Sequence, residues 1–305
     1  MSADKPLVSI VVPTYKRSDR IRVALDSIAA QDYGAENIEL IVVSDNRPEW
    51  PESAETDAAV APYAATLPHF RLLHTSGQTG GGAARNYACR QATGEYLTFL
   101  DDDDEFLPDK VSTQVAFMQE NSLDMSWQDV SWYDERGRLV EHRRLDHCED
   151  FSTEGLLRAH LLTPISPTAI YMLRRDLFDR TEGFGEVATG QDWWLKLRCI
   201  EAGAHMGYMP EVHVRQYLHS GERLSLGKNK VNGEVARHEV VRGYYPRLSK
   251  KDVRYIEFRH NAVLAFAMKR SNQPGQAVIY ALKAIASSPA ACVSEALKFF
   301  GKAKS

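Results

Sequence analysis

Four short apolar runs, each followed by a segment of helical character, occupy the first third of this 305-residue chain. They are residues 7–15 (LVSIVVPTY), 38–46 (IELIVVSDN), 70–75 (FRLLHT) and 95–101 (EYLTFLD). Runs that are apolar almost throughout and rich in Val, Ile and Leu are typical of strands buried on both faces. Their alternation with helices predicts an α/β fold with a mostly parallel sheet and right-handed crossovers.

The segments between these runs have helical patterns. Ser18 is positioned to cap a helix, and the apolar residues of that helix fall on one stripe: Ile21, Leu25 and Ile28. A glycine run begins a second helix within residues 79–92 (TGGGAARNYACRQA). Residues 47–68, rich in Ala, Glu and Pro, are predicted to form a loop and a helix.

The rest of the chain divides into a mixed part and a helical part. The mixed part contains a helix at 108–121, a hairpin at 124–142 that turns at Gly137, a strand at 168–176 and a helix at 190–203 that Gly203 ends. From about residue 228 every pattern is helical. We therefore expect an α/β domain over residues 1–227 and a helical region over residues 228–305.

Composition narrows the class of protein. A net charge of −4 gives no electrostatic reason to bind nucleic acid. The four cysteines show no CxxC or Cys/His zinc spacing, which favours reduced thiols in a cytoplasmic protein. The sequence has no run of about 18 apolar residues that would span a membrane, and its N-terminus lacks the pattern of a signal peptide.

Polar residues follow three of the predicted strands. They are Pro13-Thr14-Tyr15, Ser44-Asp45-Asn46 and the run Asp101-Asp102-Asp103-Asp104. Strand ends of an open parallel sheet gather at one edge, and ligands bind in the crevice there. A single Asp after a strand is usually a cap or turn former. It is the three strand ends together that indicate a ligand site.

Four adjacent carboxylates repel one another unless cations oppose them. Oxygen ligands alone select Mg²⁺, Mn²⁺ or Ca²⁺ over Zn²⁺. A solvated acidic loop is the alternative interpretation. The run follows YLTFL without a polar spacer, so its first Asp lies where the chain leaves the core. This placement favours a magnesium or manganese site for a diphosphate.

Three further residues are candidates. Arg85 follows the glycine run, which contains no P-loop pattern. Asp192 lies at a predicted helix start in GQDWWLKLR, where the structural alternative is an N-cap or first-turn acid. His219 follows a strand-like run in YLHSGERLS, where a purely structural histidine is the alternative.

Taken in order, these motifs resemble the family-2 glycosyltransferases of the GT-A fold. The resemblance covers about residues 6–226 and comprises VSIVVPTYKR, IVVSDN, GGAARN, YLTFLDDDDEFLPDK, GFGEVATGQDWWLKLR and YLHSGERLS. It implies a Rossmann-like, mostly parallel sheet flanked by helices, followed by a C-terminal helical extension. It also implies inverting transfer of a sugar from a nucleoside diphosphate donor, usually a UDP-sugar, to an acceptor hydroxyl in bacterial cell-surface polysaccharide or glycolipid synthesis.

The resemblance also assigns roles to residues. The matching nucleotide-binding residues are Pro13, Thr14, Tyr15, Arg17, Asp45, Arg85, Asp101 and Asp102. Asp103 matches the ligand of the Mn²⁺ or Mg²⁺ ion that bridges the diphosphate, and His219 matches a further metal ligand. Asp192 matches the catalytic base. Gln191 replaces the usual Glu, which removes an indication of acceptor preference. Asp102 stands where small residues are common, and a solvated bystander is its other interpretation.

Two rival functions remain at this stage. A sugar nucleotidyltransferase would resemble proteins with a glycine-rich, Arg-bearing loop directly after the first strand, whereas PTYKRSD contains no glycine. A non-catalytic nucleotide-sugar-binding protein would not need the retained Asp101, Asp103 and Asp192. The glycosyltransferase is therefore the favoured prediction.

The C-terminal region combines apolar stripes with basic residues. The stripes are Val253, Ile256, His260, Val263 and Ala267; then Val278, Leu282 and Ile285; then Val293, Leu297 and Phe300. Four lysines (Lys283, Lys298, Lys302 and Lys304) are set against Glu295 alone. A basic amphipathic helix can lie on an anionic membrane, while packing on the body or in a homodimer is the alternative. We expect a cytoplasmic enzyme that contacts the inner face of the membrane through residues 276–305 and acts on a glycan or lipid-linked acceptor.

Overall fold

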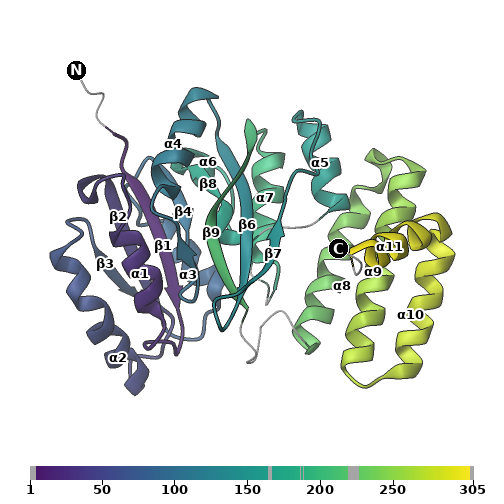
Figure 1. Ribbon diagram of the computed structural model, residues 1–305, viewed down its shortest axis with the longest axis horizontal. Helices are drawn as coiled ribbons and strands as arrows, with labels where there is room; N and C mark the ends of the chain where they lie inside the picture. Colours follow the sequence, from purple (N-terminus) through teal and green to yellow (C-terminus); the bar gives the residue numbers. More distant parts are fainter. Residues whose placement is uncertain (1–4, 164–166, 186, 188, 219–226, 303–305) are drawn as a thin grey trace. The chain divides into compact units, whose positions relative to one another are not determined.

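The computed structural model describes residues 5–302 except 164–166, 186, 188 and 219–226 (Figure 1). It divides into two compact units, each of which has its own buried residues. The first, here called the sheet unit, comprises residues 1–157 and 165–220. The second, the helical unit, comprises residues 158–164 and 221–305.

The first four strands form the parallel half of one sheet. They are β1 (Val8–Thr14), β2 (Ile38–Ser44), β3 (Arg71–His74) and β4 (Tyr96–Phe99), in the spatial order β3-β2-β1-β4. Every residue of β2 and β4 is buried. The intervening helices are α1 (Ile21–Ala29), α2 (Pro51–Val60) and α3 (Gly81–Cys89). The strands predicted from the apolar runs are confirmed, as is the stripe of α1.

The later strands make the sheet mixed. They are β5 (Glu105–Phe106), β6 (Met125–Asp134), β7 (Leu139–Arg143), β8 (Met172–Arg174) and β9 (Met206–Leu218). β8 lies antiparallel between β4 and β6, and β9 runs parallel to β6. The predicted hairpin is β6–β7, and Gly137 at its turn has φ 72°. The two-residue β5 and the full length of β9 had no clear sequence signal.

Helices complete the sheet unit. They include α4 (Lys110–Glu120), α6 (Arg175–Asp179) and α7 (Gln191–Glu201). The helix after the hairpin, α5 (Thr153–Leu162), begins in this unit, and its residues from Arg158 onward belong to the helical unit. α7 ends before Gly203, whose φ of 73° is favoured by glycine, as expected. The predicted Ser18 cap of α1 is wrong. The backbone first turns on the Arg17 carbonyl, so α1 begins at Ile21 and Ser18 instead donates to Glu55.

The helical unit contains α8 (Gly227–Gly243), α9 (Lys250–Arg270), α10 (Pro274–Ser287) and α11 (Pro289–Lys302). Ser249 caps α9 by accepting a hydrogen bond from the Asp252 amide at 3.1 Å. Of the stripe predicted on α9, Ile256 is buried and the other members are half-buried. The helices expected from residue 228 onward are confirmed.

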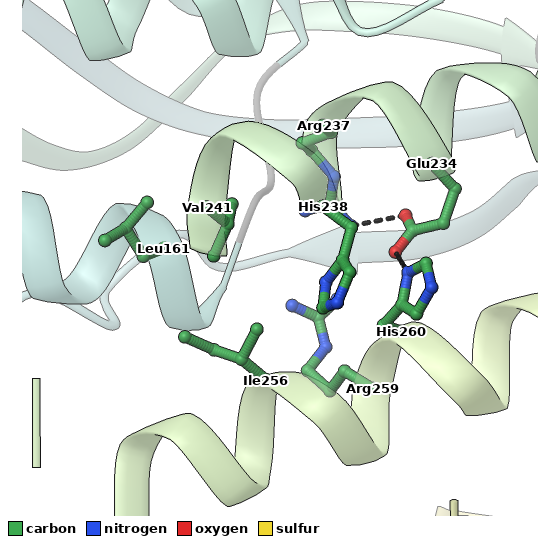
Figure 2. Close-up of a pocket in the computed structure, with 8 residues that line it drawn as sticks. All are labelled: Leu161, Glu234, Arg237, His238, Val241, Ile256, Arg259 and His260. Carbon is green, nitrogen blue, oxygen red and sulfur yellow. Dashed lines mark hydrogen bonds and ion pairs between the residues drawn. The ribbon is translucent and has the colours of Figure 1, made fainter. Parts of the chain in front are cut away.

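A compact polar cluster lies between α8 and α9 (Figure 2). The rings of His238 and His260 stack with centroids 3.7 Å apart. Glu234 pairs with Arg237 and lies 3.0 Å from Nδ1 of His260. Glu257 Oε1 lies 3.3 Å from Nε2 of His238 and accepts the Tyr245 hydroxyl at 2.7 Å. Both glutamates therefore have partners within the helical unit. We call these six residues the histidine cluster.

Candidate active site

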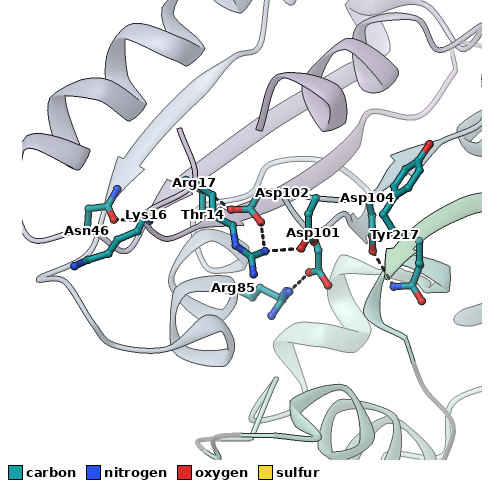
Figure 3. A network of polar contacts seen from close by, with 11 residues as sticks. Thr14, Lys16, Arg17, Asn46, Arg85, Asp101, Asp102, Asp104 and Tyr217 are labelled. Carbon is teal, nitrogen blue, oxygen red and sulfur yellow. Dashed lines mark hydrogen bonds and ion pairs between the residues drawn. The ribbon is translucent and has the colours of Figure 1, made fainter. Parts of the chain in front are cut away.

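The acidic run forms a turn between β4 and β5 that separates its carboxylates into two pairs (Figure 3). The Asp104 amide donates to the Asp101 carbonyl at 3.1 Å and closes the turn. Asp102 and Asp104 are 5% and 3% exposed, whereas the side chains of Asp101 and Asp103 are 35% and 16% exposed. One pair thus belongs to the protein interior, and the other is partly exposed. We call residues 101–104 the acidic turn.

Asp102 is anchored to the end of β1. Its carboxylate accepts from the Thr14 hydroxyl at 2.7 Å and from Arg17 Nη1 at 3.0 Å. Burial raises the pKa of Asp102 to about 6, even though Arg17 and Thr14 act in the opposite direction. The interpretation of Asp102 as a solvated bystander is wrong, because the β1 end encloses the side chain and supplies both of these donors.

Asp104 is anchored to β9. Gln216 Nε2 donates to one carboxylate oxygen at 2.8 Å, and the Tyr217 amide donates to the other at 3.1 Å. Burial raises the pKa of Asp104 well above its ordinary value, and the charges of Asp101 and Asp103 raise it further. Asp104 therefore fixes the turn against the sheet.

Two arginines oppose the more exposed pair. Arg17 Nη1, which also contacts Asp102, donates to Asp103 Oδ2 at 2.6 Å. Arg85, from the first turns of α3, pairs with Asp101 through Nη2. Among the residues that the structure describes, two guanidinium groups thus offset part of the charge of four carboxylates.

Arg85 also connects the acidic turn with the start of α7. Its Nη1 donates to Gln191 Oε1 at 3.3 Å, and the side-chain Nε2 of Gln191 donates to the Val187 carbonyl at 3.1 Å. A Cβ on Gly82 would lie 2.8 Å from the Gly185 carbonyl oxygen. Glycine at this position therefore permits the close approach of α3 to the segment before α7.

Asp192 lies in the first turn of α7, as predicted. Gly190 occupies the N-cap position with φ 79°, so Asp192 is not the cap. Its carboxylate accepts from the Trp193 amide at 2.8 Å, which is the contact expected of a first-turn acid. Burial raises its pKa to about 6, against the lowering effects of the Trp193 amide and Arg85. The side chain is only partly exposed, and its assignment as the base stays a prediction.

The predicted nucleoside pocket has an aromatic component that sequence reasoning missed. Pro13 and Thr14 end β1, and Tyr15 follows with 39% exposure. The Tyr15 ring lies 6.3 Å from the ring of Trp50, and Lys16 Nζ lies 3.9 Å from that second ring. Trp50 directly precedes α2 within residues 47–68, where the sequence shows no motif that would have identified it.

Asp45 is nearly buried and organises the loop before α3. Its carboxylate accepts from the Thr79 amide at 3.0 Å, the Thr79 hydroxyl at 2.7 Å and the Gly80 amide at 2.8 Å. These contacts are those of a turn former. Contact between Asp45 and a base stays a prediction. His219, the other predicted metal ligand, lies outside the described residues.

The residues present fit a divalent ion that is shared with a diphosphate. In the described part of the chain, no three His, Cys, Asp or Glu side chains converge on a preformed metal site. Magnesium commonly uses one or two protein carboxylates together with substrate phosphates, and Asp101 and Asp103 are two partly exposed carboxylates. In addition, Arg85 Nε is buried without a hydrogen-bond partner among the described residues. An anionic ligand could use this donor.

Comparison with known proteins decides the family. A sequence profile described as glycosyl transferase family 2 matches residues 9–181. The chain belongs to this family. A putative colanic acid biosynthesis glycosyl transferase of Escherichia coli is 34% identical over 72% of this chain and 69% of its own length. An uncharacterized glycosyltransferase of Rickettsia typhi is 35% identical, with coverage of 83% and 76%.

Other relatives in family 2 are much longer than this chain. The matches span 28% of an uncharacterized glycosyltransferase of Rickettsia bellii, which is 31% identical over 65% of this chain, and 35% of one from Rickettsia felis. The chain therefore corresponds to about a third of these relatives.

Solved structures share the fold. Staphylococcus aureus TarS residues 1–349, in complex with UDP-GlcNAc, matches with a TM-score of 0.60, 19% identity and 90% coverage of both chains. A mannosyltransferase of Pyrobaculum calidifontis, in complex with GDP-Man and Mn²⁺, matches with a TM-score of 0.61 and 21% identity over 97% of this chain and 80% of its own. At these identities the likeness shows the fold alone, and the expected GT-A fold is confirmed.

Proposed function

We propose that this family-2 member is an inverting glycosyltransferase that moves a sugar from a nucleoside diphosphate to an acceptor hydroxyl. The observation that supports it best is the double contact of Arg85. This residue pairs with Asp101 of the acidic turn and with Gln191, the residue next to Asp192. This double contact supports a single site that contains the acidic turn and the candidate base, as glycosyl transfer requires.

The donor side of the site contains the carboxylates of the acidic turn and the guanidinium groups of Arg17 and Arg85, which a divalent ion and a diphosphate would bind. A divalent ion held by Asp103 would stabilise the charge that develops on the leaving diphosphate. Arg17 and Arg85 can turn their guanidinium groups from the carboxylates to the diphosphate oxygens, because Arg recognises both kinds of anion. His219 is proposed as a further ligand of the ion, by resemblance. The bound Mn²⁺ of the mannosyltransferase neighbour supports Mn²⁺ or Mg²⁺ as the cofactor.

The nucleoside would lie against the end of β1. Tyr15 and Trp50 present aromatic rings near Lys16, and Pro13, Thr14 and Asp45 belong to the same strand ends. UDP is the expected nucleotide. The UDP-GlcNAc bound to TarS supports a UDP-sugar, although the GDP-Man of the other neighbour makes a guanine donor the alternative.

On the acceptor side, Asp192 would remove the proton of the attacking hydroxyl. A general base works best when its pKa lies near the operating pH, and burial raises the pKa of Asp192 to about 6. A single displacement from the face opposite the diphosphate inverts the anomeric centre. The colanic acid relative supports an acceptor in bacterial cell-surface polysaccharide or glycolipid synthesis.

A donor panel tests the proposal. Purified protein is incubated with UDP-, GDP- and dTDP-sugars, with Mn²⁺, Mg²⁺ or a chelator, and free nucleotide is measured. We expect metal-dependent release of a nucleoside diphosphate from one donor. Release of pyrophosphate from a nucleoside triphosphate and a sugar phosphate would instead identify a nucleotidyltransferase. Donor binding without release, with a set of candidate acceptor glycans present, would support the non-catalytic alternative.

A further inference from the structure

Helix α10 exposes its large aliphatic side chains and buries only a small one. In this helix only Ala284, a small residue, is buried. Tyr280 is half-buried, and the four large aliphatic side chains are exposed: Val278 by 58%, Ile279 by 47%, Leu282 by 61% and Ile285 by 46%. A helix that packs in a core normally buries its largest apolar residues and exposes its polar ones. The large apolar residues of α10 thus face away from α9, against which the helix packs.

Helix α11 extends the exposed apolar surface. Val293 and Leu297, four positions apart and therefore on one helical face, are 61% and 67% exposed. We call the six residues of α10 and α11 the apolar tail face. No single helix among the described residues is long and apolar enough to cross a bilayer. α10 and residues 289–295 reach that composition together, but they meet at an angle of 108°.

The tail is basic although the chain is acidic. Residues 266–305 contain six Lys or Arg and one Glu, while the whole chain contains 37 Lys and Arg against 41 Asp and Glu. The excess of negative charge therefore lies entirely in residues 1–265. Lys283 is on α10 itself, between Leu282 and Ala284 of the sequence. The apolar tail face thus belongs to a part of the chain with a net positive charge.

We infer that the apolar tail face docks on the surface of an anionic lipid bilayer. Its side chains would enter the boundary of the acyl chains, and the exposed Lys283 on α10 would face the lipid phosphates. The bend between α10 and α11 favours a position in the plane of the interface over a span. A symmetric contact between two copies would bring two basic tails together, so charge favours lipid over a second copy. This inference goes beyond glycosyl transfer and does not depend on it.

Vesicle co-sedimentation of the full chain tests the inference. The probes are vesicles of phosphatidylcholine alone and of phosphatidylcholine mixed with phosphatidylglycerol, at low and high salt. We expect binding to the anionic vesicles, weakened by salt because lysine–lipid attraction is screened. The double change Val278→Gln with Leu282→Gln should lower partitioning by about tenfold or more, since it removes two apolar anchors.

A matched control separates this surface from general hydrophobicity. Leu139 and Val140 of β7 are 57% and 54% exposed, much like Val278 and Leu282. Leu139→Gln with Val140→Gln should leave partitioning unchanged. Circular dichroism and donor binding show that each variant is folded, and these readouts do not require that the chain transfers sugar.

Three outcomes would overturn the inference. The first is equal partitioning of the wild-type chain and the α10 variant on anionic vesicles. The second is equal binding to neutral and anionic vesicles, which would remove the role of charge. The third is a lipid-free dimer in analytical ultracentrifugation that Leu282→Gln dissociates, combined with no vesicle binding. That result would assign the apolar tail face to a second copy of this chain.

Discussion

The acidic turn and the histidine cluster both concentrate ionisable side chains, but they differ in how their charge is offset. In the histidine cluster, Glu234 and Glu257 each have partners in the same unit. In the acidic turn, two arginines face four carboxylates among the described residues, and Asp101 and Asp103 stay partly exposed. A cluster with balanced charge stabilises a fold, whereas an excess of one sign indicates a place for a ligand.

The largest effect is expected beside the acidic turn, at Asp192. Asp192→Asn keeps the shape of the side chain but removes its proton acceptance, so turnover should fall by about 10²–10⁴-fold. Donor affinity, measured by calorimetry, should change little. Asp176→Asn is a matched control, because Asp176 is also a first-turn acid of a helix.

The pH profile sharpens this prediction. Since the base must be ionised and the pKa of Asp192 is about 6, the rate of the wild-type protein should rise with pH through about 6 and then level off. The Asn variant should lose this dependence. Weak donor binding with a nearly normal rate would make Asp192 a structural residue of α7.

A change in the acidic turn should damage activity and spare stability. Asp103→Asn should lower metal-dependent turnover by about 10³-fold, because a metal supplies several kcal/mol of charge stabilisation. The melting temperature should not fall, since the substitution removes one of several repelling charges. Nucleotide release across a Mn²⁺ titration gives the first quantity, and a thermal melt gives the second. Near-normal turnover with Mn²⁺ would refute the metal assignment.

The corresponding change in the histidine cluster should have the opposite result. Glu234→Ala leaves Arg237 and His260 without the carboxylate that they share, and breaking a buried pair costs about 3 kcal/mol. Urea denaturation followed by circular dichroism measures this loss. Nucleotide release at low temperature should be retained. If activity fell while stability held, the cluster would be functional and the contrast would fail.

The two units should also respond to pH in opposite directions. Burial raises the pKa of Asp102 to about 6, so between about pH 4 and pH 6 the folded protein keeps a proton that the unfolded chain releases. Stability present at the acid end is therefore lost as pH rises through this window, by about 3 kcal/mol for this group in metal-free protein. Asp102→Asn should flatten the trend.

In the histidine cluster the sign reverses, and the effect should be the smallest. Burial, and then the charge of His260, lower the pKa of His238. The unfolded chain then takes up a proton more readily than the folded one, and stability is lost as pH falls below the ordinary value of about 6.5. Hydrogen exchange resolved by segment would measure both units in one sample. A common trend in the two would contradict the assignment.

Sequence patterns predicted the elements whose burial is regular along the chain. Strands enclosed on both faces, such as β2, produce continuous apolar runs, and helices such as α1 produce stripes. The two residues of β5 are too few to show a period, and β9 mixes polar and apolar residues because it is only partly buried. The Ser18 cap failed because a backbone turn at Arg17, which no local pattern records, delays the helix.

Sequence patterns indicated candidate residues that the structure brings together, such as Arg85 and Asp101, but they did not indicate most of the contacts. Asp102 and Asp103 are adjacent in the sequence, yet one is enclosed by the β1 end and the other is open. That difference depends on the position of β1, to which the turn is linked by Thr14 and Arg17. Trp50 near Tyr15 was missed for a similar reason, since two residues far apart in sequence meet only in the folded chain.

The position of Arg17 has a consequence for the order in which ligands bind. If Asp103 is the metal ligand as proposed, a free divalent ion would have to compete with the guanidinium group for it, and this competition would lower the affinity of the ion alone. A diphosphate would offer Arg17 another anion and leave the carboxylate to the ion. Ion and donor should therefore strengthen each other's binding, and by thermodynamic linkage the gain is the same for both. Arg17 would therefore occupy the Asp103 carboxylate until a sugar nucleotide binds, and the protein would hold little metal between turnovers.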